Sequence, residues 1–291
     1  MPEKPFTLLS LPALKSTPQA IKKFPFPIDF TAGKYPDLEL AFHKGAVQAL
    51  HRGIDIREFS FVWLTSGWNY RDIAYALHLY LESAGTPHSY VEKSPSKVTD
   101  CMVFALNGLP IPDTVFVSRS NVEKSMGLIK KTCGYPLIIK DIRGARGKHS
   151  EFVASESDLL EKMAGLPKNK SFLFQRYIPN EYDWGIMVVN GVVVAGEKSY
   201  HSDGEFRNNA CNGADEQFVD LIDIPKEIKD MAVKASGHLG LSWSRADIII
   251  DKQTGLPYLL EVNRYPGITA GSSEVQGAYT FLASHITPAA L

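Results

Sequence analysis

Apolar and polar positions in the first third of the chain predict a small α/β unit. The run "FSFVWL" at residues 59–64 is apolar enough for a buried strand, and it leads through a loop containing Gly67 into a helix. The helix places its apolar residues on one face: Ile73, Ala76, Leu77 and Leu81. A strand followed by a helix is half of a βαβ unit. The preceding 58 residues carry scattered prolines and predict one helix, around residues 40–52.

A second unit is predicted to begin near Ser94. The stretch "SKVTDCMVFALNG" predicts a helix closed by Gly108, followed by the turn "LPIPDT", the strand "VFVS" and a helix that ends near Cys133. The stretch "PLIIKDIRGARGKHSEFVAS" then predicts a hairpin whose first strand ends in Lys140. A further helix is predicted at residues 156–164.

The last third of the chain predicts a sheet with one covering helix. "SFLFQRYIP" is expected to be an edge strand, and "YDWGIMVVNGVVVAGEKSYH" predicts two strands that turn at Asn190 and Gly191. "FRNNACNGADE" is a polar loop, and "PKEIKDMAVKASGHLG" is an amphipathic helix with a glycine stop. The strands "SRADIIID" and "YLLEVN" form a closing hairpin around "KQTGLP".

Composition narrows the class of protein. The 291 residues are 44% hydrophobic and 22% charged with a formal net charge of −1, which argues against a main role in neutralising a nucleic-acid backbone. Three widely spaced cysteines indicate neither a disulfide framework nor a cysteine zinc site. No apolar run reaches the length of a membrane span, and the N-terminus lacks a secretion signal, so we expect a soluble cytoplasmic protein.

Two acids in the closing hairpin need a partner, because each lies within an apolar strand. Asp247 lies seven residues before Thr254 and Glu261 seven after it, so a hairpin symmetric about Thr254 places the carboxylates opposite each other. Asn263 shares their face and adds an amide oxygen. Two carboxylates and an amide favour magnesium, with manganese as the alternative ion. The other interpretation is a solvated hairpin face on which lysine or arginine neutralises the acids.

The predicted hairpin after Lys140 has a basic tip with glycines. Gly144 and Gly147 allow backbone amides to approach an anion, and four basic residues crowd the same tip: Arg143, Arg146, Lys148 and His149. A P-loop is excluded, because the glycines join two strands and no G-K-[ST] ending follows. The tip is therefore either a phosphate-binding loop or a solvated basic turn.

Several of these segments together resemble a known superfamily. Lys97, Lys140, "QRYI", "FRNN", "ADIII" and "EVN...PG" occur in the order found in ATP-grasp proteins, and within them in RimK-type carboxylate-amine ligases. The resemblance covers about residues 60–275 and implies an ATP-grasp fold, with α/β and α+β parts. Residues 1–94 would form a small pre-ATP-grasp α/β domain, residues 95–175 a central α+β lobe with a glycine-rich lid, and residues 176–291 a C-terminal α+β lobe with the magnesium site.

The resemblance also implies roles for individual residues. It implies that the nucleotide contacts Lys97, Lys140, Gly144, Gly147, Gln175, Arg176, Tyr177, Ile178, Asp183, Arg207, Asn208 and Asn209. Within this set, backbone groups of residues 176–178 would contact the edge of adenine, and Tyr177 and Ile178 would make apolar contacts with it. Asp183 would contact the ribose, with Glu181 as the alternative ribose partner. Arg207, Lys140 and Asn209 would act on the transferring phosphoryl group. The metal ligands would be Asp247, Glu261 and Asn263.

The sequence departs from the family pattern at three places. Arg176 stands where relatives commonly have an acid, and His149 replaces a lid glycine. An arginine usually found shortly after the ribose acid is missing, and Trp184 and Gly185 stand there instead. These departures indicate a divergent substrate.

The implied activity is an ATP- and magnesium-dependent ligation that joins a carboxylate, through an acylphosphate, to an amine. The substrates would be small molecules or peptides, with an amino acid or peptide favoured, and the protein would form a homo-oligomer as its relatives often do. The alternative is an ATP-binding regulatory or scaffold protein of the same fold without ligase activity. A third hypothesis is an ATP-grasp kinase or carboxylase partner.

Overall fold

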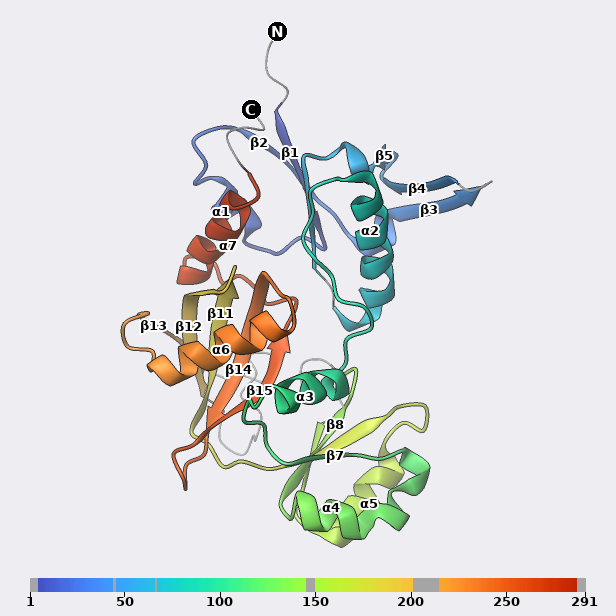
Figure 1. The fold of residues 1–291 in the computed structure, drawn as a ribbon, viewed down its shortest axis with the longest axis vertical. Coiled ribbons are helices and arrows are strands. Elements are labelled where there is room, and N and C mark those ends of the chain that lie inside the picture. Colours follow the sequence, from blue (N-terminus) through green and yellow to red (C-terminus); the bar gives the residue numbers. More distant parts are fainter. Residues whose placement is uncertain (1–4, 44–45, 66, 145–149, 201–214, 287–291) are drawn as a thin grey trace.

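The computed structural model describes residues 5–43, 46–65, 67–144, 150–200 and 215–286. Figure 1 shows an N-terminal sheet, a five-stranded sheet and a four-stranded sheet along the long axis of the molecule, with α3 (Lys97–Leu106) between the last two. Within the described part of the chain, no helix combines the length and the apolar character needed to cross a membrane.

The N-terminal part contains the predicted strand and helix. Its parallel sheet has the order β2-β1-β6, and α2 packs its buried side chains on the same core as Val62 and Leu64. The bounds are β1 Phe6–Leu11, α1 Thr17–Ile21, β2 Ile28–Ala32, β6 Phe61–Leu64 and α2 Arg71–Ala84. The predicted face of α2 is half wrong: Leu77 and Leu81 are buried, whereas Ile73 and Ala76 are exposed. Ala74 and Tyr80 complete the buried face instead.

The helix predicted around residues 40–52 is wrong. This segment forms an antiparallel sheet of β3 (Leu38–His43), β4 (Ala46–His51) and β5 (Ile54–Asp55), which projects from the molecule in Figure 1. Partly buried and exposed residues alternate at the start of β3, which is the period of a strand. Pairing along six residue pairs between β3 and β4 therefore outweighs the helix propensity of the alanines and leucines in this segment.

The four-stranded sheet has the order β7-β10-β8-β9, and every neighbouring pair is antiparallel. The bounds are β7 Thr114–Phe116, α4 Met126–Thr132, β8 Leu137–Asp141, β9 Ser150–Val153, α5 Glu156–Gly165 and β10 Phe172–Arg176. These confirm the predicted strands and helices. The prediction of an edge position for "SFLFQRYIP" is wrong, because β10 lies between β7 and β8. The position of β10 between two hydrogen-bonded neighbours agrees with its buried apolar residues Phe172, Leu173 and Phe174, which Gln175 and Arg176 follow at the end of the strand.

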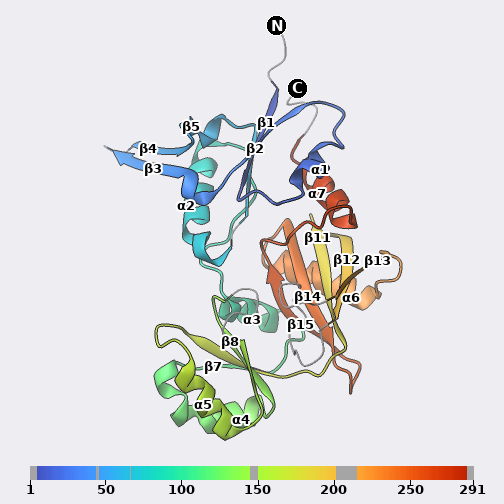
Figure 2. The same cartoon turned by 180° about the vertical axis from the view of Figure 1, so that it is seen from behind.

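The five-stranded sheet has the order β13-β12-β11-β14-β15, with α6 on one face. Figure 1 shows α6 in front of this sheet, and Figure 2 shows the sheet from its other face. The bounds are β11 Tyr182–Val189, β12 Val192–Tyr200, β13 Asp215–Val219, α6 Lys226–His238, β14 Trp243–Ile250 and β15 Pro257–Asn263. The predicted turn is confirmed, because Asn190 and Gly191 both have positive φ, as the tight hairpin requires.

A shared core joins the N-terminal sheet to the five-stranded sheet. α7 (Ser273–Ala283) lies beside α1, and its Phe281 contacts both Trp63 of β6 and Trp243 of β14. The rings of Trp63 and Trp243 are 5.1 Å apart and nearly perpendicular, a favourable aromatic arrangement. Five short 3-10 helices complete the described elements: Tyr35–Asp37, Ile56–Glu58, Trp68–Tyr70, Arg119–Asn121 and Glu123–Ser125.

Candidate functional site

One face of the five-stranded sheet is charged, while α6 covers the other. Strand alternation and register place the following residues on the charged face: Asp183, Gly185, Glu197, Arg245, Asp247, Glu261 and Asn263. Lys97 of α3 and Lys140 of β8 approach the same region, because both act electrostatically on Glu261. The three predicted metal ligands and the two lysines predicted to bind phosphate are therefore brought together from three parts of the chain.

Asp247 and Glu261 lie directly opposite each other, as predicted. A β-bulge at Leu260 makes this possible, since the hairpin runs in register up to the pair Ile248 and Leu259 and then skips one residue. Without the extra residue, Asp247 would face Leu260 and Glu261 would point to the α6 side. The predicted pairing is confirmed, but it depends on the bulge and not on the symmetric hairpin that was predicted.

Polar partners hold both carboxylates. Lys97 Nζ donates to Glu261 Oε2 at 2.7 Å, and Asn263 Nδ2 donates to Asp247 Oδ2 at 2.8 Å. Arg245 Nε lies 3.5 Å from Asp247 Oδ1. The lysine and arginine of the alternative interpretation are thus present, but the side chains of Asp247 and Glu261 are only 18% and 33% exposed, so the face is not an open solvated one.

The two carboxylates have opposite electrostatic surroundings. Burial raises the pKa of Asp247, and the neighbouring Glu261 charge adds to the rise against the opposing effect of Arg245. Burial would also raise the pKa of Glu261, but the ammonium groups of Lys97 and Lys140 hold that pKa below its usual value. The donor set fits a hard divalent cation, because carboxylate oxygens converge here and Asn263 keeps its amide oxygen for a ligand while its nitrogen donates.

Lys97 and Lys140 approach this pair from α3 and β8. Ser96 and Thr99 form a capping box that fixes the start of α3, and Lys97 Nζ also donates to the carbonyl of Gly144 at 3.0 Å. Lys140 Nζ donates to Gln175 Oε1 at 2.7 Å, and Gln175 in turn donates to Thr114 Oγ1 at 2.9 Å. Burial lowers the pKa of Lys140, an effect that Glu261 opposes. Gln175 is therefore a buried residue that orients Lys140.

The residues predicted at adenine lie where β10 ends. Backbone N–H groups of Arg176 and Tyr177 donate to the carbonyls of Asp113 and Pro136, at 2.8 and 3.2 Å. The Arg176 guanidinium donates to the Tyr258 hydroxyl at 3.0 Å, so this side chain is directed to β15. The N–H groups of residues 176 and 177 are thus already used within the protein, and the buried Ile178 remains as the apolar contact.

The two candidate ribose acids differ in their surroundings. Asp183 accepts a hydrogen bond from Asn180 Nδ2 at 2.6 Å and lies close enough to Lys140 to influence its pKa. Glu181 is 62% exposed and pairs with Lys252 at 3.1 Å. Asp183 is therefore the one that shares the charged face with the metal candidates.

Sequence reasoning missed a buried ion pair on this face. Arg245 Nη1 donates to Glu197 Oε1 at 2.6 Å, and the Glu197 side chain is 2% exposed. A Cβ on Gly185 would lie 2.8 Å from Glu197 Oε1 and 3.3 Å from Arg245 Cδ, so only glycine leaves room for the pair. Two signals were available: Arg245 precedes Asp247 by two residues and must share its face, and Glu197 interrupts an apolar strand.

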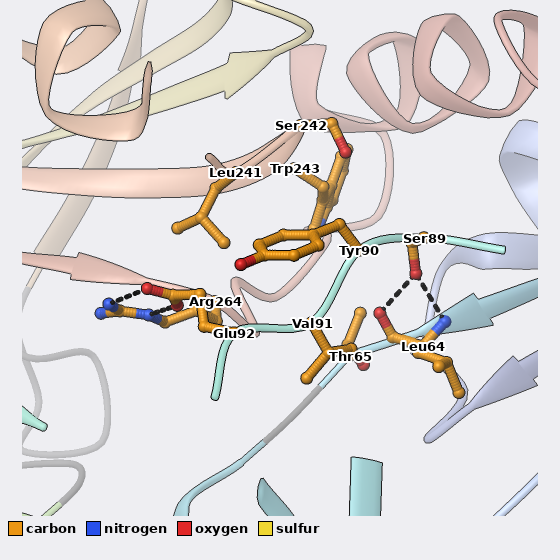
Figure 3. Close-up of a pocket in the computed structure, with 10 residues that line it drawn as sticks. All are labelled: Leu64, Thr65, Ser89, Tyr90, Val91, Glu92, Leu241, Ser242, Trp243 and Arg264. Atoms are coloured by element: carbon orange, nitrogen blue, oxygen red, sulfur yellow. Dashed lines mark hydrogen bonds and ion pairs between the residues drawn. The ribbon is translucent and has the colours of Figure 1, made fainter. Parts of the chain in front are cut away.

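A small pocket lies where the N-terminal sheet, the segment before α3 and the C-terminal strands meet (Figure 3). Tyr90, Leu241 and Trp243 line it together with Glu92 and Arg264. Arg264 donates to Glu92 at 2.6 Å and bidentately to Asp100, with both distances 2.7 Å. Arg264 follows Asn263 directly, so this buried ion cluster fixes the end of β15 against α3 and the preceding segment.

Several predicted site residues lie outside the described part of the chain: Arg146, Gly147, Lys148, His149, Arg207, Asn208 and Asn209. Of the predicted catalytic residues, Lys140 is described, and of the predicted lid glycines, Gly144 is described. The roles of all these residues remain predictions.

Comparisons with known proteins agree with this geometry. A family model described as "RimK-like ATP-grasp domain" matches residues 95–280. The chain is 32% identical over 183 residues to "Probable alpha-L-glutamate ligase" of Vibrio atlanticus and 31% identical to that of Saccharophagus degradans. Each alignment covers 61% of this chain and 58% of the relative, so the chain matches little more than half of these proteins.

Solved structures show the same fold over nearly the whole chain. The D-Ala:D-Ser ligase VanG from Enterococcus faecalis superposes with a TM-score of 0.71 at 16% identity, covering 97% of this chain and 100% of that one. The ATP-grasp ligase PsnB, in a complex with a phosphomimetic variant of its minimal precursor, Mg and ADP, gives a TM-score of 0.66 at 16% identity, covering 97% and 100%. The fold is therefore an ATP-grasp fold, as predicted.

Proposed function

Because this chain belongs to the RimK-like ATP-grasp family, we propose that it is an ATP- and magnesium-dependent ligase that joins a carboxylate to an amine. The observation that carries the proposal is the opposed pair of Asp247 and Glu261, flanked by Lys97 and Lys140 from other parts of the fold. A hard-cation donor set beside two ammonium groups suits a nucleotide triphosphate with its metal. We assign residues 1–94, 95–175 and 176–291 to the pre-ATP-grasp domain and the two lobes.

The proposed reaction has two steps. The γ-phosphoryl group of ATP moves to a carboxylate oxygen, which gives an acylphosphate and ADP. The amine nitrogen then attacks the acyl carbon, the C–N bond forms, phosphate leaves with the C–O bonding electrons and the nitrogen loses a proton. Neither step requires a protein nucleophile, so the protein acts by positioning and by electrostatic stabilisation.

The residues of this chain divide that work. Lys97 and Lys140 bind phosphate oxygens, and Gln175 holds Lys140 in place through the 2.7 Å hydrogen bond. The Ile178 side chain and backbone carbonyl groups of the neighbouring residues contact adenine. Asp183 accepts hydrogen bonds from the ribose. Asp247, Glu261 and Asn263 would hold magnesium, which neutralises negative charge on the phosphates when bound. Arg245, paired with Glu197, keeps Asp247 oriented toward the ion.

We further propose that the substrates are an amino acid or a peptide together with a second small molecule or peptide. The relatives named alpha-L-glutamate ligases and the complex of PsnB with its precursor peptide support this class. The family arginine that is missing at Trp184 and Gly185 supports a distinct substrate within the class. In this chain the positive charge comes from Arg245 on the neighbouring strand β14.

ADP release from ATP, measured with magnesium and with pools of carboxylates and amines, tests the proposal. We expect ADP only when both substrates are present, with phosphate formed in equal amount. Asp247→Asn should abolish this turnover, whereas Asp220→Asn, at an exposed position after β13, should leave it unchanged. ATP binding without ADP release under any pool would support the scaffold alternative and contradict the ligase. A stable phosphoester product would indicate a kinase.

A further inference from the structure

Three metal-ligating side chains converge far from the charged face of the five-stranded sheet, in the N-terminal part. His78 and Glu82 lie one turn apart on α2, and His88 lies on the segment that follows this helix. His78 Nδ1 is 2.8 Å from His88 Nε2, and His88 Nε2 is 3.8 Å from Glu82 Oε2. One ligand atom from each residue lies within 4.8 Å of the others.

A backbone contact fixes the tautomer of His88. Its Nδ1 lies 2.7 Å from the carbonyl oxygen of Thr86, which can only accept, so Nδ1 carries the proton and donates it. Nε2 therefore presents a lone pair toward His78 and Glu82. A metal-binding histidine commonly donates its second ring nitrogen to a backbone carbonyl in this way, which orients the ring and strengthens the ligand nitrogen.

We propose that His78, Glu82 and His88 bind a divalent transition metal, with zinc as the preferred ion and water as the fourth ligand. Two imidazole nitrogens and one carboxylate match three-ligand zinc sites, whereas magnesium prefers oxygen ligands. Zinc–nitrogen distances of about 2.0–2.1 Å in a tetrahedral site place two nitrogens ~3.3 Å apart. The two histidine nitrogens are 2.8 Å apart, so the His78 ring must shift by about half an ångström to reach this spacing. The proton between His78 Nδ1 and His88 Nε2 is then lost and the ion takes its place.

The surroundings of the three side chains leave one side open for a water ligand. Burial, followed by the neighbouring His88, lowers the pKa of His78. Tyr75 and Tyr90 pack on His78, with ring centroids 5.9 and 5.4 Å away. The Glu82 side chain is 71% exposed, so water can approach the site from the side of Glu82. The His88 side chain is only 6% exposed, so the opposite side of the site is closed by protein.

The bound ion would fasten the segment that leads to the nucleotide-binding lobes. His88 pairs with Val62 of β6, and Ser89 exchanges hydrogen bonds with Leu64 (Figure 3). The same segment carries Tyr90 into the pocket and Glu92 to Arg264. A metal bridge from α2 to His88 therefore stabilises the position of this segment, which is a structural role separate from the proposed reaction.

Zinc binding to the full chain, measured by equilibrium dialysis in millimolar magnesium, tests the inference. We expect one equivalent of zinc at this site, and a loss of affinity of at least about tenfold in His88→Ala and in Glu82→Gln. Glu82→Gln alters a mostly exposed side chain, so it should fold even if His88→Ala does not. The matched control is His238→Ala at the exposed end of α6, which should bind zinc as the unaltered chain does.

Cobalt gives a second measurement that does not depend on enzyme activity. Cobalt at a four-coordinate nitrogen-containing site shows strong visible absorption, which an octahedral oxygen site lacks. At the same limiting cobalt concentration, this absorption should be strong in the unaltered chain and in His238→Ala and markedly weaker in Glu82→Gln. Zinc affinity that is unchanged in both Glu82→Gln and His88→Ala, or the absence of zinc binding in magnesium buffer, would overturn the inference. Neither result bears on the ligase proposal.

Discussion

The two faces of the five-stranded sheet use the same strands for opposite purposes. On the α6 face, Ile248, Leu259 and Val262 are at most 2% exposed and contact only an apolar cluster. On the other face, their neighbours Asp247 and Glu261 are carboxylic acids that lie beside Arg245 and Lys97. Because successive side chains of a strand point to opposite faces, adjacent residues of one strand can serve the core on one side and the candidate site on the other.

The two faces also differ in how they affect the free energy of unfolding. Apolar burial under α6 stabilises the fold, at roughly 25 cal/mol for each Å² removed from water. Buried charges on the opposite face are weak contributors, since desolvation offsets much of their attraction. Substitutions on the charged face should therefore change mainly activity, and substitutions on the α6 face should change mainly stability.

The largest effect is expected from Glu261→Gln on the charged face. Turnover should fall by at least ~10³-fold, or about 4 kcal/mol in activation free energy, because a metal ligand loses its charge. The glutamine oxygen can still accept from Lys97, so the thermal midpoint should stay within a few degrees of the original. ADP release and thermal unfolding of the same preparation measure the two quantities. An unaffected rate would contradict the metal assignment.

Ile248→Ala tests the opposite face. Removal of this fully buried side chain under α6 should lower the free energy of unfolding by about 2–5 kcal/mol. Activity per folded molecule should not change, because the altered atoms face away from the charged side. Urea unfolding measures the loss, and Leu256→Ala, which removes a 55% exposed side chain in the adjoining turn, is the control. A change in kcat at full folding would show that the two faces are coupled.

The buried Glu197 should make stability depend on pH. Burial is the main cause that raises the pKa of Glu197 to about 7, with Arg245 opposing it, whereas an ordinary glutamate carboxyl has a pKa of 4.5. Between these values the folded chain keeps a proton that the unfolded chain has lost, so the free energy of unfolding falls as pH rises from 4.5 to 7. The loss amounts to at most about 3 kcal/mol.

Comparison with Glu197→Gln isolates this contribution, since glutamine does not titrate. The free energy of unfolding, measured in urea at pH 5 and pH 7.5, should fall more steeply with pH for the unaltered chain than for the variant. Equal slopes would show that Glu197 is ionised throughout, with Arg245 compensating fully for its burial.

The smallest effect is expected from Gly185→Ala. The added methyl group would meet Glu197 and Arg245 and should cost about 1–3 kcal/mol of stability by overpacking. It should also lower kcat/KM, since Arg245 positions Asp247. Gly237→Ala in α6 is the matched control, because its Cβ meets no atom within 4 Å and alanine favours a helix. Equal stability and equal kcat/KM in the two variants would show that Gly185 has no special role in the site.

The sequence was most informative where a pattern extends over many residues. Apolar runs and glycine stops located α2, α3, α5 and α6, and the Asn190-Gly191 turn fixed the hairpin between β11 and β12. It was least informative for residues 38–51, where leucines and alanines suit a helix and a strand alike. In that segment the pairing partner decided the structure, and a partner strand is not visible in local composition.

The candidate site shows the same division. Asp247, Glu261 and Asn263 were found from spacing, since acids in apolar strands stand out. The bulge at Leu260, the pairing of Arg245 with Glu197 and the position of β10 inside its sheet were not found. Each of these features depends on which strands pair in the sheet, and the sequence of a single strand does not identify its pairing partners.

The sequence by itself determined the family, most of the helices and strands, and the opposed acids Asp247 and Glu261, because periodicity and chemistry are properties of short segments. The tertiary structure alone decided that Lys97 and Lys140 meet Glu261 from α3 and β8, and that Arg264 joins Glu92 and Asp100. These contacts connect residues more than a hundred positions apart, and only the packing of the sheets brings such residues within hydrogen-bonding distance.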